Sequence, residues 1–592
     1  MIIPALAHYY DQLLERHSDD VPRPGWCSKW VKGMLVLSED GALINVIPAS
    51  EKRGWEKTVP EQVEVTSSPR ANFLCGNSKY LLGIEAKEGA SCTEEHFELS
   101  RELHCEWLQG VDSVCARAVC AYYESWDPRR ASEHPVILRA EDIVYSGNLV
   151  FAVADARGVR EVLDDCAVQE AVAALGASRL ESGSEKMLCF DSGALEPAEK
   201  VHPSIQGVYG AHSRGAKLVS FNNPSFCSYG CDEDAKGLNA PISKRSAQAY
   251  VTALEYLLSH DNHHFRLGDT TVVYWSEQCD DGNCDLIGSL LDFTTPFDQR
   301  SGANEDTDKN LDVALREIAL GHLPDIEGAD FGSTFYMLGI APNAARLAIR
   351  FFMRDAFGSV VKNIQRYYED TAVAHGPGEK ERLAPCAALK SLENSNSKDP
   401  VVSSQLSASF LRAVLEGSRY PDALYTNTLL RIRATHKVSR ENAAIIKAYL
   451  IRNAGKSREE ITVELNRERD DIAYCLGRAF AISEQIQAAA NGDKSNIAAR
   501  YLNSACSTPG IVFPVLFKLT NAHLVKLDRD MPGFAVAMRR EMGSVMKGIQ
   551  TFPKRLSLES QGDFELGYYH QTEDRYKPKA KKENQPVEEM QE

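Results

Sequence analysis

The spacing of apolar residues changes near residue 400, and this change constrains the fold more than any other feature of the chain. Beyond that point, apolar residues recur every three or four positions, and Ser, Asn, Gly or Pro stand at the segment ends. This period is typical of packed helices. The segments are 404–416, 421–433, 439–453, 457–490, 495–505 and 511–527. The sequence therefore predicts a helical bundle over residues 400–572.

The residues before this point mix helical and strand periods. Helical spacing occurs in MIIPALAHYYDQLLERH and in 93–123 and 161–179, whereas VILRAED (136–142), NLVFAV (148–153) and TTVVYW (270–275) are typical of strands. MLVLSEDGALINVIP at 34–48 predicts a hairpin that turns at Asp40-Gly41. We therefore expect an α+β protein, with a mixed N-terminal region followed by an all-α bundle.

The length of 592 residues is too great for one core and suggests roughly three or four domains. The best linker is HGPGEKERLAP with SLENSNSKDP, over 375–400. We predict a mixed region at 1–215, an α+β region at 216–390, the bundle at 400–572 and a disordered, highly charged tail at 573–592.

The chain is acidic overall, but its charge is uneven. The net charge is −17, yet residues 401–592 hold 28 Lys/Arg against 23 Asp/Glu, which leaves 38 against 60 for the rest. Residues 431–458 hold eight basic residues and one acid, Glu441. Such a patch predicts phosphate contacts, with a solvated helix face as the alternative. Six of its residues are the candidates: Arg431, Arg433, Lys437, Arg440, Lys447 and Arg452.

A second set of basic residues recurs at multiples of four over 346–368. These residues are Arg346, Arg350, Arg354, Lys362 and Arg366. On a helix this spacing makes a slowly winding basic stripe. We expect a basic helix there, which suits a phosphate backbone or an acidic neighbour and is equally what an ordinary amphipathic helix presents.

A polar turn near residue 72 displays groups that suit nucleic acid. Asn72 and Asn77 can pair with base edges, Phe73 can wedge against an opened base step, and Lys79 can contact a phosphate. The alternative is an ordinary polar turn with Phe73 in the core. Lys29 and Lys32, near two tryptophans, are weaker candidates for contacts with the same duplex.

Residues 219–275 place further hydrogen-bonding side chains among glycines and prolines, so turns display them. They are Asn222, Ser228, Tyr229 and Asn239. The block shows no paired acid and base and no phosphate loop. It is therefore interpreted as a second recognition surface.

Catalytic interpretations are weaker. His260 to His264 reads HDNHH, and its dense imidazole and carboxylate groups raise the hypothesis of a metal-dependent nuclease. The same residues end a helix and lead into a strand, as an ordinary surface turn does. We expect no catalytic centre, no cofactor and no metal. Charged residues interrupt the first twenty positions and no apolar run reaches about 18 residues, so we expect a cytoplasmic protein without a membrane span.

Several motifs resemble one family in order and spacing. They are Val219-Ser220-Phe221-Asn222, Ser228-Tyr229-Gly230, Asn239-Ala240-Pro241, Gly268-Asp269-Thr270-Thr271, FYMLGIAPNAARLAIRFF at 335–352 and Gly567-Tyr568-Tyr569-His570-Gln571. They are similar to the large subunit of the type I-C CRISPR interference complex, Cascade. The resemblance extends from residue 1 to about 571.

This resemblance implies a non-catalytic subunit that recognises the PAM, a short duplex motif beside the target. Its partners would be a guide RNA, multicopy backbone subunits, a subunit that caps the RNA 5′ end, small subunits, target double-stranded DNA and a helicase-nuclease. The turn around Asn72 would read the PAM, and the bundle would hold the displaced strand. A scaffold that binds only protein partners is the remaining alternative.

Overall fold

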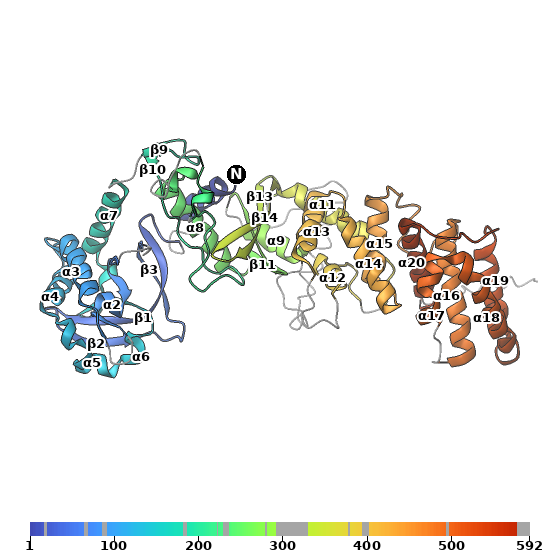
Figure 1. Cartoon of the computed structure of the whole chain (residues 1–592), viewed down its shortest axis with the longest axis horizontal. Coiled ribbons are helices and arrows are strands. Elements are labelled where there is room, and N and C mark those ends of the chain that lie inside the picture. The colour runs from blue at the N-terminus through green and yellow to red at the C-terminus, as the bar shows by residue number, and fades with distance from the viewer. Residues whose placement is uncertain are drawn as a thin grey trace, which may run out of the picture. The chain divides into compact units, whose positions relative to one another are not determined.

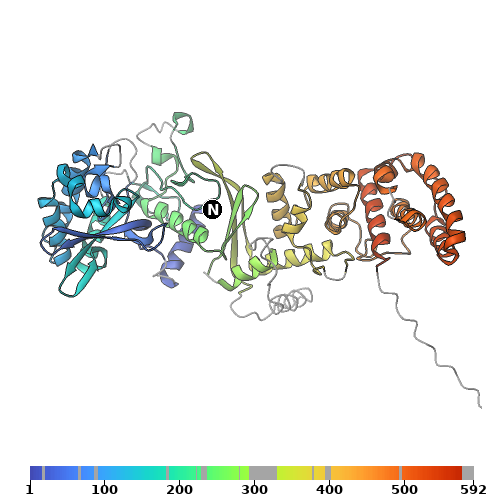
Figure 2. The ribbon, with the colours of Figure 1, turned by 90° about the horizontal axis from the view of Figure 1, so that it is seen from below.

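The computed structural model describes residues 1–16, 21–63, 69–85, 91–181, 186–221, 223–228, 236–278, 281–291, 330–376, 379–393, 402–492 and 497–576. These residues form two compact units. Unit 1 contains Met1–His260 and Pro342–Ala348, and unit 2 contains Asp261–Ala341 and Ile349–Glu592. Figures 1 and 2 show them in two orthogonal views. The predicted domain limits near 215, 390 and 572 stay predictions.

Unit 1 contains a six-stranded sheet built around β1 (Trp26–Ser38). β1 pairs antiparallel with β2 (Leu43–Pro48) and β3 (Trp55–Pro60), and parallel with β7 (Asn148–Asp155). β4 (Cys75–Asn77) and β8 (Gly158–Glu161) extend the sheet from β7. The predicted hairpin at 34–48 is confirmed, because β1 and β2 join through Gly41 at φ +87°.

Helices cover this sheet, and Figure 1 shows α3 and α4 beside it. They are α2 (Ser78–Leu81), α3 (Glu94–Leu108), α4 (Val114–Ser125), α5 (Pro135–Arg139), α6 (Glu141–Val144) and α7 (Cys166–Glu181). The strand predicted for VILRAED is wrong, because Pro135 opens α5 and Glu141 and Asp142 occupy the first turn of α6. The helical spacing predicted for residues 93–123 corresponds to two helices, α3 and α4, with Gly110 at φ +85° between them.

In the remainder of unit 1, helices from the beginning and the end of the 1–260 segment pack together. α1 (Ile2–Arg16) packs on α8 (Lys244–Ser259), with Tyr9 and Tyr256 ring to edge at 6.4 Å. A small hairpin, β9 (Lys186–Leu188) with β10 (Leu195–Pro197), precedes the loops of the 219–241 block. Short strands β5 (Ile84–Glu85) and β6 (Ser91–Cys92) pair, and the described residues of the unit also form four short 3-10 turns.

Unit 2 begins with a four-stranded sheet of order β11-β12-β13-β14. The strands are β11 (His264–Leu267), β12 (Thr270–Ser276), β13 (Thr334–Asn343) and β14 (Arg346–Ala356), the last two shared with unit 1 near their turn. α9 (Asp281–Leu291) packs on β12, and α11 (Phe357–Thr371) follows β14.

The predicted basic helix over 346–368 is therefore wrong for its first half. Aromatic and branched residues such as Ile349, Phe351 and Phe352 favour a strand, and Ala344 at φ +54° turns the chain back from β13. Arg346, Arg350 and Arg354 are an even number of residues apart, so they share one face of β14.

The predicted bundle is confirmed as a run of helices, most of them close to their predicted limits. The helices are α12 (Pro385–Lys390), α13 (Ser404–Glu416), α14 (Asp422–Thr435), α15 (Arg440–Arg452), α16 (Ile472–Asn491), α17 (Ile497–Ser507), α18 (Pro509–Asp530), α19 (Pro532–Met546) and α20 (Leu558–Glu573). The prediction of a helical segment over the whole of 457–490 is wrong, because α16 begins only at Ile472. Asp471 is its N-cap and accepts a hydrogen bond from the backbone amide of Tyr474. α20 also runs one residue into the predicted tail, whose residues 577–592 lie outside the described part.

Two glycines allow close contact between α16 and α20. A Cβ at Gly477 would overlap the carbonyl oxygen of Phe564, and one at Gly567 would overlap that of Tyr474. The two backbones therefore approach more closely than larger residues allow. Within the described helices, α18 alone is long and apolar enough to cross a membrane, and its inner face packs in the bundle core.

Candidate nucleic-acid interface

The turn before β4 holds its side chains more firmly than the sequence predicts. The Oδ1 atom of Asn72 accepts a hydrogen bond from the amide of Val63 at 2.8 Å. Phe73 is fully buried and stacks on the ring of His104, with centroids 5.1 Å apart. The prediction that the turn displays Phe73 to a base step is wrong, because this ring anchors the turn in the core of unit 1.

His104 is the support of this turn, and nothing in the sequence pattern singled it out. Leu74 has φ +57°, which costs a non-glycine residue about 1–3 kcal/mol, and its amide donates to Nε2 of His104 at 2.8 Å. The other ring nitrogen lies 2.6 Å from the carbonyl oxygen of Ser100. Burial lowers the pKa of His104 to about 4, so the neutral ring holds both backbone groups.

The end of the sheet brings polar residues of two strands, β4 and β7, side by side in one row. Asn148 of β7 lies opposite Val31 of β1 on one side and opposite Asn77 of β4 on the other. Strands lie roughly 4.8 Å apart, so Asn77 is about 10 Å from β1. Asn77 is exposed, and Asn148 is half-buried. Asn148 was not among the predicted residues, although it begins a strand that the sequence predicts.

The predicted lysines lie close to this row. Lys32 follows Val31 in β1. The aliphatic part of its side chain lies against Gly147, the residue before Asn148. Its ammonium group donates to the carbonyl of Lys52 at 2.9 Å. Lys79 is in α2, two residues after Asn77, and its Nζ lies 3.8 Å from a carboxylate oxygen of Glu85.

Lys29 lies on β1 opposite Lys57, next to a shallow aromatic cleft. Trp30 and Trp55 line this cleft of about 380 Å³, together with Glu51 and Glu56 among others. The guanidinium carbon of Arg53 lies 4.0 Å from the ring centroid of Trp30. Of the predicted set, Asn77, Lys29 and Lys32 thus lie on strands of the sheet and Lys79 on α2, whereas Asn72 contacts Val63 and Phe73 lies in the core.

The second predicted surface is only partly described. Asn222 and Tyr229 lie outside the described residues. The exposed Ser228 donates its amide to Oδ1 of Asn239 at 2.7 Å, so the side chain of Asn239 holds the turn together. Nearby, the guanidinium of Arg346 lies 4.2 Å from the ring of Phe226. The hydrogen bond brings together two residues of the predicted surface, Ser228 and Asn239, that are 11 residues apart in the sequence.

The basic patch of the bundle differs from its prediction, because acids from α11 neutralise its inner members. Lys447 is buried and donates to the carbonyl oxygens of Glu369 and Asp370, both at 3.1 Å. Burial lowers its pKa to about 8. Arg452 is buried against the carboxylate of Asp370. Phosphate contact by Lys447 and Arg452 in the folded bundle is therefore wrong.

The remaining four candidates are less enclosed. Arg433 donates to the side chain of Gln561, and Arg440 donates to the carbonyl of Glu381 at 2.9 Å. Arg440 also lies 3.6 Å from Glu379. Arg431 is half-buried and Lys437 is exposed, both at the C-terminal end of α14 or just beyond it.

A family model described as CRISPR-associated protein (Cas_Csd1) matches residues 6–576. The match covers nearly the whole chain. The chain belongs to this CRISPR-associated family. No curated protein sequence matches it. The family membership predicted from the motifs is therefore confirmed, while the role within a type I-C complex needs a separate argument.

The histidine cluster of this CRISPR-associated protein serves its local fold. Nδ1 of His260 lies 2.8 Å from the carbonyl of Tyr256, and the buried His263 has Nδ1 3.3 Å from the carbonyl of Tyr274. In the part of the chain that the structure describes, no three His, Cys, Asp or Glu side chains are grouped to hold a metal ion. The sequence hypothesis of a nuclease gains no support from this geometry.

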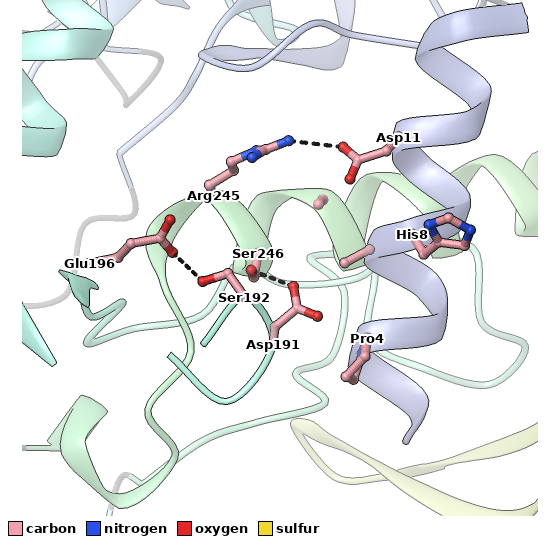
Figure 3. A pocket seen from close by; sticks show the side chains of 10 residues that line it. Pro4, His8, Asp11, Asp191, Ser192, Glu196, Arg245 and Ser246 are labelled. Carbon is pink, nitrogen blue, oxygen red and sulfur yellow. Dashed lines mark hydrogen bonds and ion pairs between the residues drawn. The ribbon is translucent and has the colours of Figure 1, made fainter. Parts of the chain in front are cut away.

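A partly open polar pocket lies in unit 1 between α1, α8 and the β9–β10 hairpin (Figure 3). It measures about 220 Å³. Asp11 pairs with Arg245 at 3.1 Å, and Asp191 accepts a hydrogen bond from Ser246 at 2.6 Å. These contacts link α1 and the hairpin to α8. We therefore interpret the pocket as a polar gap in the packing between these elements.

Proposed function

We propose that this CRISPR-associated protein is the large subunit of a type I-C Cascade complex and that unit 1 reads the PAM. The row of Asn77 and Asn148, with Lys32 beside it, carries this proposal. Two amides and an ammonium group at one sheet end suit a DNA duplex, because amides bond base edges while lysines contact phosphates.

The anchoring of the turn supports the same role. Reading a base requires side chains whose position is fixed before binding, and Phe73, Leu74 and His104 fix the backbone that leads into β4. Arg70 is exposed at the start of the turn, where it suits a phosphate. In this proposal, Asn72 shapes the turn through its bond to Val63 and Asn77 faces the DNA.

The rest of the function follows from the division of labour in RNA-guided systems. Base pairing with the guide RNA reads the target, and the protein reads only the flanking duplex. The subunit would be non-catalytic, cytoplasmic and joined to the guide RNA, backbone subunits, the subunit that caps the RNA 5′ end and small subunits. It would then support recruitment of the helicase-nuclease.

Fewer residues of the bundle are available to hold the displaced strand than the sequence predicts. With Lys447 and Arg452 buried, we assign this contact to Lys437 and Arg431, with Arg433 and Arg440 at its edge. Phosphate contacts of this kind weaken with added salt and carry no sequence preference.

The test is binding of the assembled complex to targets that differ only in the flanking motif, at fixed salt. Asn77→Ala and Asn148→Ala should each lower the preference for the correct motif about tenfold, since a lost base contact costs about 1–3 kcal/mol. Asn45→Ala is the matched control, because Asn45 is an exposed amide on β2 opposite Val36, away from the row. Equal weakening of all targets would reject base reading by this row.

A further inference from the structure

Helix α18 has two opposite faces, and only one of them is covered. Successive residues of a helix are about 100° apart, so positions four, seven, eleven, fourteen and eighteen residues apart share one side. Phe513, Leu516, Thr520, Leu524 and Leu527 are buried and form the inner side. Ile511, Val515, Lys518, Ala522, Val525 and Arg529 form the side directly opposite, and all six are exposed.

The outward face is unusually apolar for a solvated helix. Ile511 is 72% exposed, Val515 48% and Val525 56%. The same helix is long and apolar enough to cross a membrane by length and composition, yet only a third of its most apolar stretch is buried inside the protein. The face extends from residue 511 to 529, which is about 27 Å at 1.5 Å per residue.

Its charges are all of one sign. Lys518 and Arg529 lie on the stripe, Lys526 borders it, and none of the stripe positions is acidic. The two carboxylates of α18, Asp528 and Asp530, lie outside the stripe, and Asp528 is paired with Arg539 of α19 through two hydrogen bonds of 2.6 Å. An occupant of this face must therefore bury apolar side chains and supply negative charge.

The shape of the apolar residues distinguishes between anionic occupants. Surfaces that hold single-stranded nucleic acid stack bases on aromatic rings, and the stripe contains only Ile, Val and Ala between its cations. Helices that lie on membranes use Trp, Phe and Leu to enter the lipid. Aliphatic residues at these spacings are instead what one helix presents to another.

We propose that the outward face of α18 is a docking surface for an acidic amphipathic helix of a protein partner. The partner helix places aliphatic residues against Ile511, Val515 and Val525 and carboxylates beside Lys518 and Arg529. This inference is independent of PAM reading by unit 1, because it uses contacts of the bundle alone.

The test uses the full-length protein and a fluorescent designed helix of about three heptads, with Leu at a and d and Glu at e and g. A second helix with Lys in place of Glu is the charge control. We expect the acidic helix to bind at least tenfold more tightly than the basic helix. Val515→Glu and Val525→Glu should each weaken binding of the acidic helix at least tenfold.

The matched control is Val463→Glu, which puts the same change at an exposed valine outside α18. Circular dichroism checks that each variant is folded, and Lys518→Glu tests the charge without altering an apolar residue. Equal binding of both helices, or equal binding by Val525→Glu and Val463→Glu, would overturn the proposal. A different outcome would also overturn it: the acidic helix does not bind, but a single-stranded oligonucleotide, anionic vesicles or a second copy of the chain does, and Val525→Glu abolishes that binding.

Discussion

The guanidinium of Arg452 and the carboxylate of Asp370 form an ion pair that solvent hardly reaches. Nε of Arg452 donates to Oδ2 of Asp370 at 2.9 Å, and the two side chains are 2% and 1% exposed. A second amino group of Arg452 donates to the carbonyls of Ala413 and Ser418, each at 3.2 Å. One residue of the basic patch thus joins α11, α13 and α15.

Removal of either partner should destabilise unit 2 strongly. Arg452→Ala or Asp370→Ala leaves a buried charge without its counterpart, which costs about 3–5 kcal/mol. Lys437→Ala, at an exposed basic position of the same patch, should change the free energy of unfolding by less than about 0.5 kcal/mol. Denaturant unfolding of the three variants measures this difference. Equal stability of Arg452→Ala and Lys437→Ala would contradict the structural role of Arg452.

Acid should loosen the turn around Leu74. The pKa of His104 is about 4 in the folded protein, below its usual 6.5, so the unfolded chain binds more protons between these values. Stability from the neutral ring is complete above about pH 6.5 and is lost as pH falls toward 4, by up to about 3 kcal/mol. Hydrogen exchange at the amide of Leu74 should speed up over this window. His104→Gln should remove the pH dependence, and an unchanged profile in that variant would refute the assignment.

Alkali should act on the bundle in the opposite direction. Burial raises the pKa of Glu565 in α20 from 4.5 to about 8, against the effects of Cys506 and Arg433, which lower it. The folded protein then holds a proton that the unfolded chain releases, so stability decreases as pH rises from about 4.5 to 8. Glu565→Gln mimics the protonated acid and should flatten this decrease. Thermal unfolding at pH 6 and pH 8 compares the two proteins, and an equal decrease in both would exclude Glu565 as its source.

Glycine substitutions should separate close packing from helix propensity. Gly477→Ala would force α16 and α20 apart, because its Cβ overlaps the backbone of Phe564, and such overpacking typically costs about 1–3 kcal/mol or more. Gly543→Ala, on the exposed side of α19 with nothing within 4 Å of its Cβ, should stabilise by about 0.5–1 kcal/mol. Denaturant midpoints of the two variants should therefore shift in opposite directions. A loss of stability in Gly543→Ala as large as in Gly477→Ala would contradict this packing.

Local signals predicted most of the fold. The limits of α13, α14 and α15 match the sequence segments to within about two residues, and the capping box of Ser439 and Asn442 is present. The helix predicted at 346–356 failed because arginines four residues apart share a face on a strand as well as on a helix. A spacing of four alone does not distinguish the two.

Non-local pairing limited the prediction of the site. Charge counting found the patch at 431–458, but Glu369 and Asp370, which bind its buried members Lys447 and Arg452, are on α11, 77 to 82 residues earlier in the chain. Phe73 looked displayed because Arg70, Asn72 and Asn77 are close to it in the sequence, whereas its ring stacks on His104 of α3. Asn148 was missed because only the register of β7 between β1 and β4 places it beside Asn77.

The anchoring of the turn at Phe73 and Leu74 has a consequence for how relatives of this chain diverge. Positions that hold the backbone are in the core, and exposed positions such as Arg70 and Asn77 are outside it. The two sets can therefore change at different rates. In the proposed role, a lineage can acquire a new flanking motif through surface exchanges alone, while Phe73, Leu74 and His104 must be replaced together or kept.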